Sequence, residues 1–128
     1  MVALQREKPA SGPLLTGFAG QGFRVDDEIF DGGLWLTPEW ARGWEAPAWD
    51  ALKADGLEPL LTIEPFPEFL LLGTGAQLRR PSPTFVAGVE ARNIGVEAMD
   101  SRAAARSWGM LRNEGRWIAA ALLPLNQA

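Results

Sequence analysis

The sequence contains no cysteine and no histidine, and these two absences exclude more chemistry than any motif in it suggests. Without cysteine the chain forms no disulfide, so packing must stabilise the fold, and the redox compartment cannot be deduced. The same absences remove thiol nucleophiles, Ser-His-Asp triads, histidine acid–base catalysis and every ordinary zinc site. The groups that remain are carboxylates, hydroxyls, arginines, backbone groups and two lysines, Lys8 and Lys53.

Positive charge and long apolar runs are also scarce. Lys and Arg total 12 against 16 Asp and Glu, which gives a net charge of -4. This balance argues against non-specific binding to nucleic acid or to an anionic membrane surface, because both require a cationic field. No stretch approaches the roughly 20 apolar residues that span a bilayer, and the N-terminal residues lack the apolar core of a signal peptide. We therefore expect a cytoplasmic protein without a transmembrane segment.

The length and composition fit one globular domain. The chain has 128 residues, of which 47% are apolar, and a domain of this size buries roughly two-thirds of its unfolded surface. Residues 1–15 begin with a polar segment of mixed charge, and we expect them to form a flexible tail. Residues 16–128 are expected to form a single α/β domain.

The first half of the chain shows the pattern of antiparallel strands. Residues 23–25 alternate in polarity and residues 34–37 form an apolar segment, while Asp31-Gly32-Gly33 between them is a turn signal. These features predict an N-terminal hairpin. Residues 38–47 are interpreted as a proline-containing loop, and a short helix is expected from Pro47 to Asp55-Gly56.

The second half alternates strands and helices. Strands are predicted at residues 69–72, 95–99 and 117–123, and helices are predicted to start at Ser82-Pro83 and at Asp100 or Ser101. A strand–helix–strand unit predicts a parallel crossover. Together the two halves predict an α/β fold, in which a single three-layer domain has a mixed central sheet, an N-terminal antiparallel hairpin and about three helices.

A candidate ligand site lies where the two parallel strands end. Ligands of open α/β sheets usually bind at that edge, and the loops there carry backbone donors, hydroxyls, a carboxylate and arginines that suit an anion. The candidate residues are Gly73, Thr74, Gly75, Arg79, Arg80, Asp100, Ser101 and Arg102. The alternative is structural, because the glycines also suit a tight turn, Asp100 a helix cap, and the arginines a solvated loop.

A candidate protein interface lies at Trp40 and Trp44. Tryptophan is enriched at binding hot spots, and complete burial is difficult to arrange in a proline-containing loop. The alternative is that both indoles cover the edge of the sheet. The pairs Asp26-Asp27 and Glu64 with Glu68 do not form a credible acid–base dyad, and one well-placed carboxylate, Asp100, is not a mechanism.

Several segments, in this order and spacing, resemble the respiratory complex I assembly factor three family. Residues 69–75 read Phe-Leu-Leu-Leu-Gly-Thr-Gly, and residues 95–104 read Gly-Val-Glu-Ala-Met-Asp-Ser-Arg-Ala-Ala. Residues 22–25, 33–38, 113–116 and 119–124 add to the resemblance, which covers about residues 16–124. It implies a three-layer fold with a mixed sheet, and it implies protein partners such as respiratory complex subunits or assembly factors. It supplies no catalytic residue, metal or cofactor.

The chain departs from that family's pattern in the third helix. Ala105 stands where the family has a small residue or cysteine, and Trp108-Gly109 replaces its usual Tyr-Asn. The sequence favours a non-catalytic binding or assembly protein, and it is compatible with a homo-oligomer. The alternative is a small-molecule or anion binder, including an enzyme of unknown class, at the ends of the third and fourth strands.

Overall fold

Two β-sheets organise the chain in the computed structural model, which describes residues 11–127. The smaller sheet is antiparallel, with the order β1-β2-β3. The larger sheet is mixed, with the order β5-β4-β8-β6-β7. The strands are β1 Leu15–Ala19, β2 Gly22–Val25, β3 Glu28–Phe30, β4 Gly33–Leu36, β5 Ala41–Trp44, β6 Phe69–Gly73, β7 Gly95–Met99 and β8 Ala119–Leu122.

The larger sheet is half antiparallel and half parallel. Strand β4 pairs antiparallel with both β5 and β8, whereas β6 pairs parallel with both β7 and β8. The helices are α1 Glu58–Leu61, α2 Pro83–Glu90 and α3 Ser101–Asn113, and two 3-10 turns, Trp49–Ala51 and Ala54–Leu57, precede α1. Within residues 11–127, no helix is long and apolar enough to cross a membrane.

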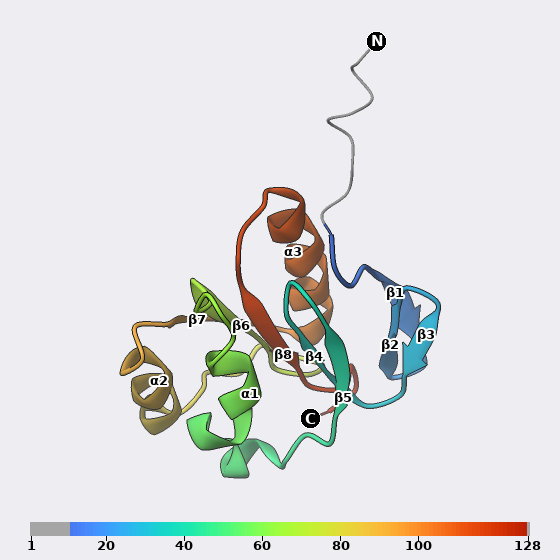
Figure 1. Cartoon of the computed structure of the whole chain (residues 1–128). Helices are drawn as coiled ribbons and strands as arrows, with labels where there is room; N and C mark the ends of the chain where they lie inside the picture. The colour runs from blue at the N-terminus through green and yellow to red at the C-terminus, as the bar shows by residue number, and fades with distance from the viewer. Residues whose placement is uncertain (1–10, 128) are drawn as a thin grey trace.

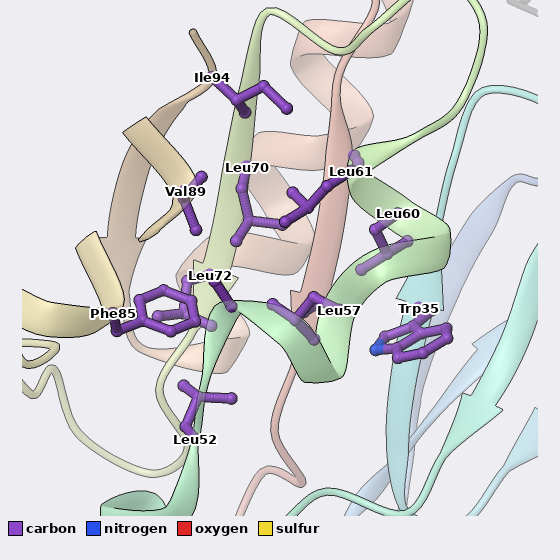
Figure 2. Close-up of a cluster of buried hydrophobic side chains, with 13 residues drawn as sticks. Trp35, Leu52, Leu57, Leu60, Leu61, Leu70, Leu72, Phe85, Val89 and Ile94 are labelled. Atoms are coloured by element: carbon purple, nitrogen blue, oxygen red, sulfur yellow. The ribbon is translucent and has the colours of Figure 1, made fainter. Parts of the chain in front are cut away.

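Strand β6 shows how the sheet divides the core into two layers. Alternate residues of a strand face opposite sides, so Leu70 and Leu72 enter one apolar cluster and Leu71 enters the other. The first cluster is closed by α1, α2 and the 3-10 turns, and Figure 2 shows their side chains gathered over the sheet. The second is closed by α3 and the small sheet, on the opposite face (Figure 1). The predicted three-layer α/β fold with a mixed sheet is confirmed.

Both predicted helix starts are confirmed by their caps. The Ser82 hydroxyl accepts a hydrogen bond from the Phe85 N–H at 3.1 Å, with Pro83 at the first helical position. The Asp100 carboxylate accepts one from the Ala103 N–H at 2.9 Å. Both side chains satisfy donors that the first turn leaves unpaired.

The predicted N-terminal antiparallel hairpin is confirmed, but the partner of β2 in it is β3, not the expected strand at residues 34–37. Strand β2 pairs with β1 and β3, whereas β4 belongs to the larger sheet. The chain already reverses at Asp26-Asp27, where Asp26 adopts a φ of 53°. Aspartate tolerates this left-handed conformation better than most residues, so β2 meets the short strand β3 before the chain reaches β4.

The interpretation of residues 38–56 is also wrong in two places. Residues 41–44 form strand β5, not a loop. The predicted helix after Pro47 is replaced by the two 3-10 turns, and the α-helix begins only at Glu58. Pro59 then occupies its first turn, where a missing N–H is tolerated.

Residues 1–10, which make up most of the expected tail, lie outside the described residues. The segment that follows them contacts the domain. The Asp26 N–H donates to the Leu14 carbonyl at 2.8 Å, and an Arg112 guanidinium N–H donates to the Ser11 carbonyl at 3.3 Å. Strand β1 then begins at Leu15.

Candidate functional site

The loops that follow β6 and β7 lie side by side, as their parallel pairing predicts. The Thr74 N–H donates to the Met99 carbonyl at 2.9 Å, and the Ser101 N–H donates to the Gly75 carbonyl at the same distance. The two strand ends are therefore bonded directly to each other, and the candidate residues 73–75 and 100–101 share one edge of the sheet.

The Thr74 hydroxyl is fully occupied by the protein itself. The side chain has no exposed surface. Its oxygen donates to the Gln77 carbonyl at 2.6 Å and accepts from the Arg79 N–H at 3.1 Å. These bonds hold the chain after β6 in a turn, so a ligand would reach the hydroxyl only if this turn opened.

The Ser101 hydroxyl joins three elements of the fold. It is also fully buried. It donates to the Leu123 carbonyl at 2.7 Å and accepts from the Gly75 N–H at 2.9 Å. A Cβ on Gly73 would lie 2.8 Å from its oxygen, so the absence of a side chain at Gly73 permits this close approach. The start of α3, the end of β8 and the loop after β6 therefore meet at one hydroxyl.

The three candidate arginines do not converge on these loops. Arg102 is exposed, with its guanidinium carbon 5.0 Å from the ring centroid of Phe18. The guanidinium carbon of Arg79 lies 4.5 Å from the ring centroid of Trp49. Phe18 and Trp49 pack against different core clusters, so the two guanidinium groups belong to opposite faces of the sheet. Arg80 is exposed beside a cavity of about 160 Å³ at the start of α2.

Removing the Ser101 hydroxyl is expected to destabilise the fold. In Ser101→Ala the Gly75 N–H and the Leu123 carbonyl lose their buried partner, which costs about 1–3 kcal/mol in the free energy of unfolding. Urea unfolding of this variant, with Thr84→Ala on the exposed side of α2 as control, measures the loss. Unchanged stability would contradict the structural role and would leave the hydroxyl available for a ligand.

Trp40 directly precedes strand β5 and Trp44 is its last residue, at the edge of the larger sheet. Both are half-buried and pack against the first core cluster. The Trp44 ring lies 6.1 Å from the Trp35 ring, tilted by 34°. The Arg42 guanidinium carbon lies 4.3 Å from the Trp40 ring centroid. Each indole therefore covers the sheet edge and also exposes part of its surface.

Thr37 holds the turn that carries Trp40. Its side chain is buried, and its hydroxyl oxygen accepts from the N–H groups of Glu39 at 3.1 Å and Trp40 at 3.0 Å. The Thr37 N–H donates to the Trp40 carbonyl at 2.9 Å. These bonds close a short turn between β4 and β5 and fix the position of the Trp40 backbone, from which the indole extends.

Two cavities lie at this edge, and each is lined by residues from both sheets. One cavity of about 600 Å³ is lined by residues 25–28 and by Glu39, Trp40 and Ala41, and a second of about 350 Å³ is lined by residues 31–33 and 43–45. Phe30 lines both cavities. We call the two cavities together the acidic groove, because their walls carry Asp26, Asp27, Glu28, Asp31, Glu39 and Glu45.

The acidic groove is not predicted by the sequence, although its residues are visible there. Its signals were the run Asp26-Asp27-Glu28 and the glutamates Glu39 and Glu45 on either side of two tryptophans. Nothing in the local pattern shows that residues 26–30 lie opposite residues 39–44, because two different sheets bring them together.

The Glu68 carboxylate joins the starts of β6 and β8. It accepts from the Arg116 Nε at 2.9 Å and from the Trp117 N–H at 3.1 Å. The hydrogen bond from the Arg116 guanidinium and then that from the Trp117 N–H lower the pKa of Glu68. A carboxyl whose pKa is lowered by folding adds stability above its unfolded value, and this stability is lost as the pH falls through the folded pKa.

Replacing Glu68 with glutamine should therefore lower stability at neutral pH but not in acid. The difference in urea midpoint between wild type and Glu68→Gln should be constant above the ordinary carboxyl pKa of 4.5 and should shrink as the pH falls below it. The effect should be small, because the paired side chains are 40–45% exposed. A difference that does not change with pH would contradict the assignment.

The fold and the strand-end loops define a small mixed-sheet α/β domain whose candidate hydroxyls at that edge, Thr74 and Ser101, are used to hold the fold. The chain belongs to the family described as "Protein of unknown function (DUF498/DUF598)", whose sequence profile matches residues 15–123. Curated relatives include proteins named "NADH dehydrogenase [ubiquinone] 1 alpha subcomplex assembly factor 3". The one from Danio rerio is 26% identical over 96% of this chain and 71% of its own length.

Other relatives extend the comparison to cattle and to bacteria. The assembly factor 3 of Bos taurus is 28% identical over 94% of this chain, which spans 65% of that protein, less than two thirds. An uncharacterised protein of Rhodobacter capsulatus is 31% identical over 94% of this chain and 92% of its own length. The resemblance to the complex I assembly factor three family is thus confirmed.

Solved structures support the same fold. A crystal structure of a Bordetella parapertussis protein has a TM-score of 0.79 and 32% identity, covering 91% of this chain and 99% of that one. The solution structure of a Bordetella pertussis protein, described as a Mth938-like domain, has a TM-score of 0.78 and 28% identity, covering 94% and 92%.

Proposed function

We propose that this chain is a non-catalytic assembly protein that acts through protein–protein contacts, in the manner of a complex I assembly factor. The observation that carries the proposal is the similarity to proteins named as complex I assembly factors over 94–96% of the chain. The absence of cysteine and histidine also favours binding over catalysis. We propose further that the protein acts in the cytoplasm.

The edge of the larger sheet at β5 is the proposed contact surface. Trp40 and Trp44 lie at the two ends of this edge and are partly exposed. Tryptophans that are partly buried by their own fold lose little freedom when a partner covers the rest of the ring. An open strand edge also offers backbone groups to a partner.

A deletion of the gene, followed by complementation, tests the proposal. Cells without the protein should contain less assembled NADH:ubiquinone oxidoreductase, measured as membrane NADH oxidation and by native electrophoresis. Wild type should restore both, and a Trp40→Ala/Trp44→Ala variant should not. Trp49→Ala is the matched control, because Trp49 packs against the same core cluster but belongs to the 3-10 turn Trp49–Ala51 and not to β5. Purified variants are first compared by circular dichroism and thermal unfolding.

Two results would contradict the proposal. Unchanged amounts of assembled enzyme in the deletion strain would contradict the assembly role. Equal loss with Trp49→Ala would contradict the proposed surface. Affinity purification of the tagged protein should recover subunits or assembly proteins of the same enzyme, and the Trp40→Ala/Trp44→Ala variant should lose them.

The second candidate, an anion-binding protein, is supported by a single observation. The Arg79 Nη2 atom is buried and has no hydrogen-bond partner within residues 11–127, which is rare for a charged group. An anion beside it would raise the melting temperature through linkage. Thermal unfolding with and without inorganic phosphate, in wild type and Arg79→Leu, tests this candidate, which fails if phosphate shifts neither protein or both equally.

A further inference from the structure

The acidic groove lies between the outermost strands of the two sheets. Strand β3 is the last of the order β1-β2-β3, and β5 is the first of the order β5-β4-β8-β6-β7. Each pairs on one side only: β3 with β2, and β5 with β4. Within residues 11–127, no other chain segment forms a ladder with either strand. The groove thus runs beside two strands that can still accept a neighbour.

Aromatic residues from both faces of the larger sheet contribute to the lining of the groove. Phe30 lines both cavities, and Trp40 and Trp44 line one each. Gly43 has no side chain, and a Cβ built there would lie 3.6 Å from the Phe30 ring. A Cβ at Gly43 would therefore meet the Phe30 ring in ordinary van der Waals contact, and a larger side chain would extend into the space that Phe30 lines.

The walls carry carboxylates on both sides. Asp27 and Glu28 belong to the β3 side and Glu39 to the β5 side, and all three are exposed. Within residues 11–127, none of them forms an ion pair. Arg42 is the one basic residue of β5, and its guanidinium lies over the Trp40 ring. The surface of the groove is therefore negative.

The arrangement of these carboxylates suits several cations in a row, not one ion. Within the described part of the chain, no three acidic side chains come together as a metal site requires. Exposed carboxylates on two opposite walls instead complement alternate basic side chains of an extended chain, since residues two apart in a strand point to the same side. Each wall would attract lysine or arginine, and the aromatic lining would cover an apolar residue.

We propose that the acidic groove binds a basic, extended segment of a partner protein, which adds to the larger sheet as a strand beside β5. This deepens the proposed function, on which it rests for the existence of a partner, by stating the partner's chemistry. Backbone hydrogen bonds along β5 supply sequence-independent affinity, and the carboxylates select basic side chains.

A peptide titration tests the proposal with the whole protein. The probe is a fluorescein-labelled peptide in which arginine alternates with valine, and its binding is followed by fluorescence anisotropy. Asp27→Lys/Glu39→Lys should weaken binding by about tenfold or more, because two attractive contacts become repulsive. Glu90→Lys/Glu97→Lys is the matched control, with the same change of net charge at exposed positions on α2 and β7, and it should bind nearly as wild type does.

Two further measurements separate the groove from general attraction. Gly43→Val should weaken peptide binding to a similar extent by filling part of the groove, and urea unfolding of the variant checks that it remains folded. A probe with alternate backbone amides methylated should also bind about tenfold or more weakly, since it cannot pair as a strand.

The proposal fails if the control variant loses as much affinity as Asp27→Lys/Glu39→Lys, because binding would then reflect net charge alone. It also fails if the methylated probe binds as well as the unmodified one, or if the probe does not bind to wild type. These outcomes are distinguishable from failure of the assembly role. A groove that binds the peptide in a protein whose deletion leaves complex I intact would uphold this inference and contradict the proposed function.

Discussion

Gly75→Ala is expected to lower the free energy of unfolding by about 2–5 kcal/mol, from a left-handed backbone and a steric clash together. Gly75 has a φ of +95°, a conformation that residues with a side chain rarely adopt. A Cβ there would lie 2.4 Å from the Gln127 carbonyl oxygen. Because the obstructing atom belongs to the backbone, it cannot move away as a flexible side chain would. Urea unfolding of the variant measures the loss.

Gly109→Ala is the matched control, and its effect should have the opposite sign. Gly109 lies within α3, and a Cβ added there meets nothing within 4 Å. Alanine in a helix interior is more favourable than glycine by roughly 0.5–1 kcal/mol, so this variant should be more stable than wild type. If both substitutions changed stability alike, the account of Gly75 in terms of φ and the Gln127 contact would be wrong.

Trp108→Ala should be the other strongly destabilising substitution, at about 3–5 kcal/mol. Trp108 is 1% exposed and is one of the largest fully buried side chains of the protein. It packs in the cluster between α3, the larger sheet and the small sheet, so its removal leaves a cavity that three elements line. A typical domain has only about 5–15 kcal/mol of total stability, and the variant should lose a large part of it. Thermal and urea unfolding measure the effect.

Met110→Ala is the control that separates the loss of a buried side chain from any effect of the substitution on the helix itself. Met110 is on the same helix but is 64% exposed, and the change should stay within about 0.5 kcal/mol. Trp108→Phe should retain part of the lost stability because it fills part of the volume. A small effect of Trp108→Ala would mean that the ring is not a packing residue, and that the replacement of the family's Tyr-Asn by Trp108-Gly109 has another reason.

The elements predicted correctly are those whose signals are local. Ser82-Pro83 and Asp100 mark helix starts through caps that need only a few neighbouring residues. The apolar run of β6 predicts a strand buried on both faces, and β6 lies between β7 and β8. Parallel pairing with β7 then follows from the helix between the two strands.

The elements that the sequence did not predict depend on distant contacts. Strand β5 has a half-exposed pattern, and the Thr37 hydroxyl, which precedes it, holds the turn that returns the chain to β4. Strand β3 has only three residues and is stabilised by pairing with β2. The contact between β5 and β4 has no signature in residues 41–44, whereas Asp26-Asp27 marks the turn before β3.

At the candidate ligand site, the sequence predicts which loops adjoin but not the hydrogen-bond partners of their side chains. Sequence order correctly predicts that residues 73–75 and 100–101 adjoin. It does not reveal that the Leu123 carbonyl, from the far end of the chain, takes up the Ser101 hydroxyl. A hydroxyl at a strand end can serve a ligand or the fold, and only its partners distinguish the two.

The position of β8 has a consequence for how the protein is made. This strand pairs with β4 on one side and with β6 on the other, yet it is synthesised after both. While the ribosome still holds residues 119–122, the hairpin β4–β5 and the crossover β6–β7 have no shared ladder, and each exposes an open edge. The larger sheet can therefore close only after β8 has been made, and until then the nascent chain carries two unpaired strand edges, which are open to pairing with other chains.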